Sequence, residues 1–260
     1  MTFWEAVLLG IVQGLTEFLP VSSSGHLEIG KFLLGEIPES LNFTVAVHGA
    51  TVLSTVVVFR KDLWHLIRGL LAFRWNEETV YILKLLLSAL PVALIGFLFK
   101  DRIEALFTGN VHFVGGMLLI TGVLLGIASF VPAGKRGISW LDALVIGVAQ
   151  AFAVIPGISR SGSTIVTALL LGNEREEATR FSFLMVLLPV VGANLVEILS
   201  GDFSGSGSVG TGALLAGTVA AFLAGLVACK WMISLVKKGK LWYFALYCLM
   251  VGSMAFFLVK

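Results

Sequence analysis

The sequence predicts an all-α integral membrane protein that crosses the bilayer several times and contains two broken helical hairpins. Three observations predict this fold class: the composition, an internal repeat, and the distribution of basic residues among the short loops. Of the 260 residues, 57% are hydrophobic and 13% are charged, and the mean hydropathy is +0.97. This composition is typical of a chain that folds within a bilayer. We therefore expect a single integral membrane domain over residues 1–260.

Apolar segments near the length that crosses a bilayer, about 20 residues, follow one another along the chain. Residues 3–35 and 139–172 are interrupted by proline, serine and glycine, and they predict broken hairpins. Residues 60–75 are basic, amphipathic and rich in tryptophan, which favours a helix on the membrane surface. Residues 200–208 are mostly serine and glycine and predict a polar linker. About six full spans remain, at residues 42–59, 81–99, 111–131, 182–200, 212–233 and 241–259.

The two broken hairpins repeat one pattern, because residues 10–25 align with residues 147–162. Five positions keep the same residue in both copies: Gly10 and Gly147, Gln13 and Gln150, Ser22 and Ser159, Ser24 and Ser161, and Gly25 and Gly162. In each copy an apolar run ends in proline, hydroxyl side chains and glycine, a combination that breaks a helix. We expect two re-entrant hairpins within repeats of approximately 1–131 and 138–260. For the first copy, the alternative is an ordinary span followed by a loop.

The basic residues of the short loops predict the orientation. If both hairpins return to the side from which they start, one face collects Arg60, Lys61, Arg68, Arg74, Lys135, Arg136, Arg175, Arg180, Lys237, Lys238 and Lys240. The other face then holds Lys31, Lys100, Arg102 and Lys260. The positive-inside rule places the first face in the cytoplasm and the first hairpin outside. The repeats are then inverted, and their tips meet near the middle of the membrane, as in transporters.

The hairpin tips predict a site for phosphate, because ionisable residues within a membrane are costly and usually functional. Arg160 offers a planar guanidinium that matches phosphate oxygens, and a new helix begins after each tip with amides that favour an anion. Glu17 would repel a pyrophosphate unless a cation lay between them, so we expect Glu17 to hold a divalent ion, with Mg²⁺ preferred and Ca²⁺ as the alternative. The remaining candidates for substrate binding or chemistry are Gln13, Ser22, Ser23, Ser24, Gly25, His26, His48, Ser159, Ser161, Gly162 and Ser163. His48, Gln13 and Gln150 also have a simpler interpretation as packing residues.

At these residues the chain resembles the undecaprenyl-pyrophosphate phosphatase family, which is also known for bacitracin resistance. The resemblance covers essentially the whole chain and rests on three motifs: QGLTEFLPVSSSGH at 13–26, FTVAVHGATVL at 43–53 and PGISRSGSTI at 156–165. It implies removal of the terminal phosphate from undecaprenyl pyrophosphate, which regenerates the lipid carrier for cell-wall synthesis. It also implies a divalent ion and an active site that opens to the outer face of the bacterial cytoplasmic membrane.

The family's essential serine and histidine fall on Ser23 and His26, and its essential arginine falls on Arg160. The family has Glu or Gln at the position of Gln13, so Gln13 removes one carboxylate and leaves Glu17 as the main metal candidate. Three routes of cleavage stay open: attack by Ser23 activated by His26 three residues later, attack by His26 itself, and attack by an activated water.

A transporter or lipid flippase is the alternative from another functional class, because inverted repeats with broken helices are typical of transporters. The expected partners are a polyprenyl pyrophosphate and membrane lipids. A net charge of +2 without a basic run argues against nucleic acid. A homodimer is an assembly that the sequence leaves open.

Overall fold

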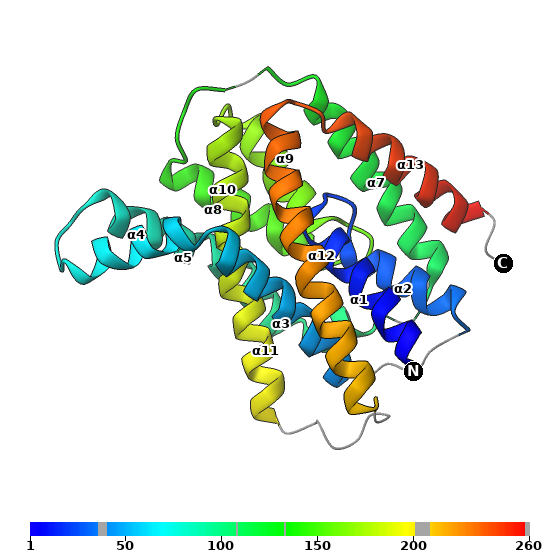
Figure 1. Ribbon diagram of the computed structural model, residues 1–260. Helices are drawn as coiled ribbons and strands as arrows, with labels where there is room; N and C mark the ends of the chain where they lie inside the picture. Colours follow the sequence, from blue (N-terminus) through cyan, green and yellow to red (C-terminus); the bar gives the residue numbers. More distant parts are fainter. Residues whose placement is uncertain (36–40, 108, 133, 201–208, 258–260) are drawn as a thin grey trace.

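The structure of the protein is a computed structural model that describes residues 1–35, 41–107, 109–132, 134–200 and 209–257, and this part of the chain is all-helical (Figure 1). The predicted linker at 200–208 lies, from residue 201 on, outside the described residues. In order, the helices are α1 (Phe3–Phe18), α2 (Ser23–Leu33), α3 (Leu41–Val58), α4 (Arg60–Leu71), α5 (Glu77–Leu98), α6 (Lys100–Glu104), α7 (Val111–Ser129), α8 (Trp140–Phe152), α9 (Arg160–Leu170), α10 (Arg175–Met185), α11 (Leu187–Ser200), α12 (Thr211–Lys237) and α13 (Trp242–Phe257).

Several of these helices are long and apolar enough to cross a membrane. Within the described ranges four qualify: Glu77–Leu98, Val111–Ser129, Arg175–Val196 (α10 with α11) and Thr211–Lys237. They confirm helices of spanning length at four of the predicted spans. A fifth candidate joins α3 to α4 across a bend of 77°. The predicted span at 241–259 corresponds to α13, which has 16 described residues and is shorter than a typical span.

The predicted surface helix at 60–75 corresponds to α4, which projects from the bundle together with the start of α5 (Figure 1). Leu66 is the buried residue of α4. The imidazole of His65 lies 2.8 Å from the carboxylate of Glu78 and ties α4 to α5. An exposed amphipathic helix that bends sharply away from a span has the geometry expected at a membrane surface.

Both predicted hairpins form a helix, a break and a second helix that packs back on the first. The first break lies between α1 and α2 and the second between α8 and α9. In each, a serine caps the new helix: Ser22 Oγ accepts from the amide of Gly25 at 3.3 Å, and Ser159 Oγ accepts from the amide of Gly162 at 3.1 Å. Both copies thus place a serine cap after the break, although Ser22 has φ +68° and Ser159 has φ −75°. That the first pair is a re-entrant hairpin, and not a span followed by a loop, stays a prediction.

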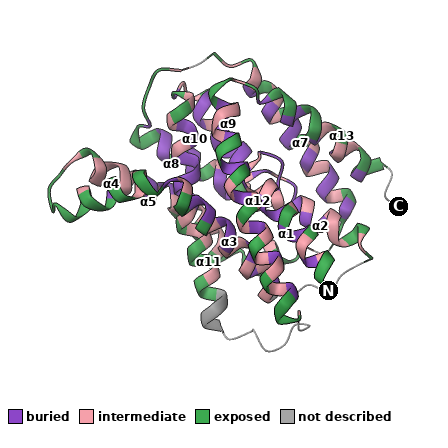
Figure 2. Ribbon diagram, viewed as in Figure 1, coloured by how far each residue is buried: buried purple, intermediate pink, exposed green. Residues whose placement is uncertain are grey.

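The helix pairs follow the sequence repeat. α1 packs against α12, α8 packs against α5, and α7 packs against α13. Gly10 and Gly147, which correspond in the two copies, allow close approach: an added Cβ would overlap the backbone of Gly217 or of Ser88. Buried residues gather where these helices meet (Figure 2). The inversion of the two copies across a membrane and the repeat bounds 1–131 and 138–260 stay predictions.

Candidate active site

The tips of the two hairpins are in direct contact. The amide of Gly157 donates to Ser22 Oγ at 3.2 Å, and Ser161 Oγ donates to the carbonyl of Leu19 at 3.3 Å. These hydrogen bonds join segments that lie far apart in the sequence. The expected meeting of the two tips is therefore observed, and it forms one wall of a cavity.

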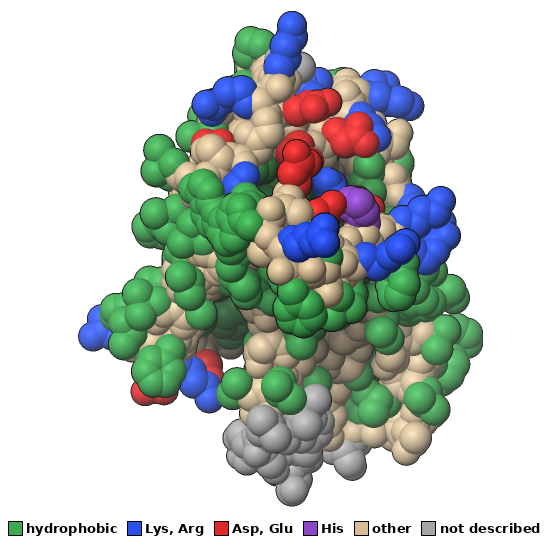
Figure 3. Space-filling model, turned by 90° about the vertical axis from the view of Figure 1, so that its left-hand side faces the viewer, with side chains coloured by type: hydrophobic (Ala, Val, Ile, Leu, Met, Phe, Trp, Pro, Cys, Tyr) green, Lys and Arg blue, Asp and Glu red, His purple; other side chains and the backbone are tan. Residues whose placement is uncertain are grey.

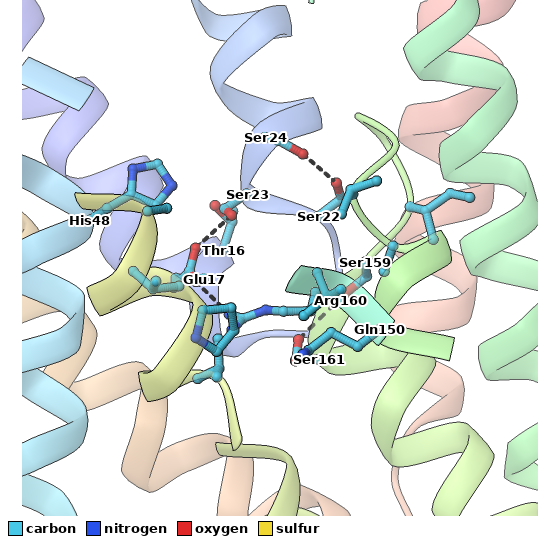
Figure 4. Close-up of a pocket in the computed structure, with 18 of the residues that line it drawn as sticks. Thr16, Glu17, Ser22, Ser23, Ser24, His48, Gln150, Ser159, Arg160 and Ser161 are labelled. Atoms are coloured by element: carbon cyan, nitrogen blue, oxygen red, sulfur yellow. Dashed lines mark hydrogen bonds and ion pairs between the residues drawn. The ribbon is translucent and has the colours of Figure 1, made fainter. Parts of the chain in front are cut away.

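This cavity has a volume of about 300 Å³ and is lined by both polar and apolar residues. Its polar lining comprises Thr16, Glu17, Ser22, Ser23, Ser24, Thr44, His48, Gln150, Ser159, Arg160, Ser161 and Asn194 (Figure 4). Its apolar lining comprises Val45, Val92, Phe107, Ala153, Val154, Ile158, Val186, Pro189, Val190 and Ala193. Such a combination suits a ligand with a polar head and a hydrocarbon tail.

Glu17 connects several of the polar residues through hydrogen bonds. Its Oε1 accepts from Arg160 Nη2 at 2.5 Å, and its Oε2 accepts from Ser23 Oγ at 2.7 Å (Figure 4). The same Oε2 also accepts from Gln13 Nε2 at 2.9 Å. The side chains of Arg160 and Glu17 are 22% and 10% exposed. Charges buried to this extent require a partner, and each of these two supplies one to the other. The sequence predicted both residues for the site but not their ion pair.

The turn before Arg160 is held from outside the cavity by Thr121 of α7. Its Oγ1 accepts from the amide of Ser159 and donates to the carbonyl of Gly157, both at 3.0 Å. Gly157 has φ +97°, and an added Cβ there would lie 2.6 Å from the carbonyl oxygen of Val114. This close approach in the left-handed region requires glycine. The backbone that leads into Arg160 is therefore held in a well-defined conformation.

His26 has partners that the sequence did not predict. Its Nδ1 lies 2.9 Å from the carbonyl oxygen of Ser22 and its Nε2 lies 2.8 Å from the hydroxyl of Tyr247, whose ring it stacks on with centroids 5.5 Å apart. His26 is not among the described residues that line the cavity. In this structure Ser23 is paired with Glu17, and the expected pair of Ser23 with His26 does not form.

The other predicted residues divide into cavity-lining and supporting groups. His48 lines the cavity, with Nδ1 2.9 Å from the carbonyl oxygen of Thr44. The hydroxyls of Ser24 and Ser161 lie 3.3 Å and 3.4 Å from those of the capping serines. Gly25, Gly162 and Ser163 belong to the first turns of α2 and α9, behind the described lining. Sequence reasoning did not single out Thr16 and Thr44, although both lie within the quoted motifs. It also missed Thr121, Asn194 and Tyr247, which are single polar residues in apolar segments outside those motifs.

The site fits a divalent ion only if the substrate supplies ligands. Glu17 is the one carboxylate among the described lining residues, and no group of three or more His, Cys, Asp or Glu in the described chain is placed to hold a metal. Mg²⁺ is often held by one or two carboxylates together with substrate phosphates. Three of the roughly four lone-pair positions of the Glu17 carboxylate are used. Gln13 Oε1 is buried and has no partner within the described residues, but Gln13 is not among the described residues that line the cavity.

The fold and the cavity together define a polytopic helical membrane protein with a phosphate-compatible site inside its bundle. Comparison with known proteins then identifies the family. The family described as bacitracin resistance protein BacA matches residues 6–254, and the chain belongs to this family.

The chain is also similar to proteins named undecaprenyl-diphosphatase. The one from Christiangramia forsetii is 55% identical over 98% of this chain and 97% of its own length. The one from Bacteroides fragilis strain YCH46 is 50% identical over 97% of this chain and 96% of its own length. The one from Salinibacter ruber is 41% identical over the full length of both chains.

Proposed function

We propose that this protein is an undecaprenyl-diphosphatase, which hydrolyses undecaprenyl pyrophosphate to undecaprenyl phosphate and inorganic phosphate. The observation that carries the proposal is the hydrogen bond of 2.7 Å from Ser23 Oγ to Glu17, which is paired with Arg160 in a cavity that also has apolar lining residues. The full-length similarity to proteins of that name supports the same activity.

The pyrophosphate would lie near Arg160 and the serine hydroxyls. The first part of the polyprenyl chain would contact apolar lining residues, which include Val154, Val186 and Val190. The rest of the tail would lie in the membrane. A guanidinium beside two helix N-termini supplies the positive charge that a phosphate needs.

Ser23 is the nucleophile in this proposal, and Glu17 is its general base. Ser23 Oγ attacks the terminal phosphorus, its proton passes to Glu17 Oε2, and the bond from that phosphorus to the bridging oxygen breaks. Undecaprenyl phosphate leaves, and water then hydrolyses the phosphoserine to release inorganic phosphate. Arg160 stabilises the negative charge on the phosphoryl oxygens. His26 holds the first turn of α2 through the carbonyl of Ser22.

A divalent ion, Mg²⁺ or Ca²⁺, would be held by Glu17, and it would neutralise phosphate charge. In the same proposal the protein lies in the bacterial cytoplasmic membrane, and the cavity opens to its outer face. The loop charges support this orientation. Inverted repeats with re-entrant hairpins would bring the tips together inside the membrane.

The decisive experiment is phosphate release from undecaprenyl pyrophosphate by detergent-purified protein, with Mg²⁺ or with EDTA. We expect phosphate release to need the ion. In Glu17→Gln the rate of phosphate release should fall about 10²–10⁴-fold, because the variant lacks the general base. Ser23→Ala should be inactive. Ser129→Ala is the control, because the hydroxyl of Ser129 binds the carbonyl of Leu125 in its own helix.

Three results would change the proposal. No release from the folded wild-type protein would contradict the function and favour the flippase, which needs two compartments and no hydrolysis. Full activity in EDTA would show that the reaction needs no divalent ion. Activity retained in Ser23→Ala but lost in His26→Ala would indicate that His26, and not Ser23, is the nucleophile.

A further inference from the structure

Gln150 carries a buried amide that the cavity leaves without a partner. The residue is 2% exposed and lines the cavity, yet neither Nε2 nor Oε1 has a hydrogen-bond partner among the described residues. An unpaired buried polar group is unfavourable, and native proteins almost always satisfy it with protein, water or ligand. The amide therefore indicates that something polar occupies this part of the cavity.

The sequence repeat explains why this amide lacks a hydrogen-bond partner among the described residues. The corresponding residue, Gln13, donates its Nε2 to Glu17 at 2.9 Å. In the second copy the position of Glu17 is taken by Val154, which also lines the cavity. The second glutamine thus keeps the buried position of the first but lacks its carboxylate. Gln150 Nε2 is therefore available to donate to a ligand, whereas Gln13 Nε2 already donates to Glu17.

Arg160 is in a similar position. Its Nη2 binds Glu17, while its Nη1 is buried without a partner in the described part of the chain. Gln150 comes from α8 and Arg160 from the first turn of α9, and both line the same cavity (Figure 4). One neutral and one charged N–H donor, both unpaired, suit the oxygens of a phosphate.

We propose that Gln150 is a substrate-binding residue, whose Nε2 donates to a phosphate oxygen of the polyprenyl pyrophosphate beside Arg160 Nη1. This inference rests on the proposed function. Oε1 of Gln150 accepts from an ordered water or from a protonated phosphate oxygen. Because the amide is neutral and contacts the bound substrate before cleavage, its contribution belongs mainly to KM.

The test is Gln150→Met, which keeps the side-chain length and removes both polar atoms. We expect the KM for undecaprenyl pyrophosphate to rise about tenfold or more, since hydrogen bonds to charged groups are worth at least this factor. The thermal stability of the ligand-free protein should be unchanged or higher, because an unpaired amide has gone. In wild type, added inorganic pyrophosphate should raise Tm, and this shift should be smaller in Gln150→Met.

Two further variants complete the experiment. Gln150→Glu has the same shape but repels phosphate, so its KM should rise more than that of Gln150→Met; it also serves if Gln150→Met does not fold. Ser88→Ala is the matched control for the contact of α5 with α8. Ser88 is buried against Gly147, and its hydroxyl binds the carbonyl of Leu85 in its own helix. Its KM should equal that of wild type.

The outcomes separate this inference from the proposed function. A wild-type KM and a wild-type response to pyrophosphate in Gln150→Met would overturn the role of Gln150 and leave the phosphatase intact. A fall in kcat with KM unchanged would also contradict a contact made in the bound substrate. No phosphate release from wild type would overturn the proposed function itself.

Discussion

At the residue scale, Thr121 shows how one hydroxyl positions the site from another helix. It lies outside the set of described residues that line the cavity, yet it binds both sides of the turn that precedes Arg160. Thr121 is 2% exposed, so water cannot easily replace its hydrogen bonds. The orientation of the guanidinium therefore depends on a residue that never touches the ligand.

Removing this hydroxyl should damage both stability and activity. In Thr121→Val the amide of Ser159 and the carbonyl of Gly157 lose a partner, and we expect a loss of about 1–3 kcal/mol in the free energy of unfolding. The kcat/KM for phosphate release should also fall, because Arg160 is less well placed. Thr121→Ser keeps the hydroxyl and should restore most of the activity. Equal Tm and kcat/KM in Thr121→Val and wild type would contradict this role.

At the scale of helices, close packing at glycine sets the position of each hairpin. α1 meets α12 through Gly10, and α8 meets α5 through Gly147. Small residues let helix backbones approach in a membrane protein, where packing rather than burial from water drives association. Close packing at a glycine thus occurs at corresponding positions of both hairpins. The first helix of each hairpin is held against its neighbour in the same way.

A methyl group at one of these contacts should separate the helices. In Gly147→Ala the new Cβ would overlap the carbonyl of Ser88, which is backbone and cannot rotate away. We expect a loss of about 1–3 kcal/mol by overpacking and lower activity, because α8 carries Gln150. The matched control is Gly126→Ala in α7, where an added Cβ meets nothing within 4 Å of the described chain. Thermal unfolding in detergent measures both, and equal Tm values would contradict the packing argument.

At the scale of the whole molecule, charged side chains gather toward one end of the face that carries α4, and hydrophobic side chains dominate below them (Figure 3). Ion pairs connect different helices there: Asp62 of α4 lies 2.8 Å from Arg180 of α10, and Glu176 of α10 lies 2.7 Å from Lys237 of α12. All four residues belong to or adjoin the loops that the charge bias assigns to the cytoplasm. This face of the protein thus has a charged upper part and a largely apolar lower part.

The proposed orientation can be measured by cysteine labelling in intact cells. Cys229 and Cys248 are buried and would first be replaced by alanine. We expect Lys100→Cys to react with a membrane-impermeant thiol reagent from outside, and Arg68→Cys to react only after permeabilisation. Both positions are exposed, so the membrane decides their labelling. The reverse pattern would invert the topology and place the first hairpin on the cytoplasmic side.

Much of this architecture was predictable from local features of the chain. Apolar length and composition determine the spanning helices, and the proline, serine and glycine groups determine where α1 and α8 end. The repeat identifies both tips as equivalent, and ionisable residues in apolar surroundings identify Glu17 and Arg160 as site candidates. These features can be recognised in the sequence because each depends on residues that are close together in the chain.

The pairing of side chains was decided only by the tertiary structure. Arg160 binds Glu17 across 143 positions of sequence, and His26 binds Tyr247 across 221. Partners of this kind leave no periodic signal, because they depend on where whole helices cross. Sequence alone therefore determined a helical membrane protein and predicted a phosphate site at two repeated breaks. Only the tertiary packing decided that Ser23 donates to Glu17, that His26 contacts Tyr247 and that the amide of Gln150 has no partner among the residues that the structure describes.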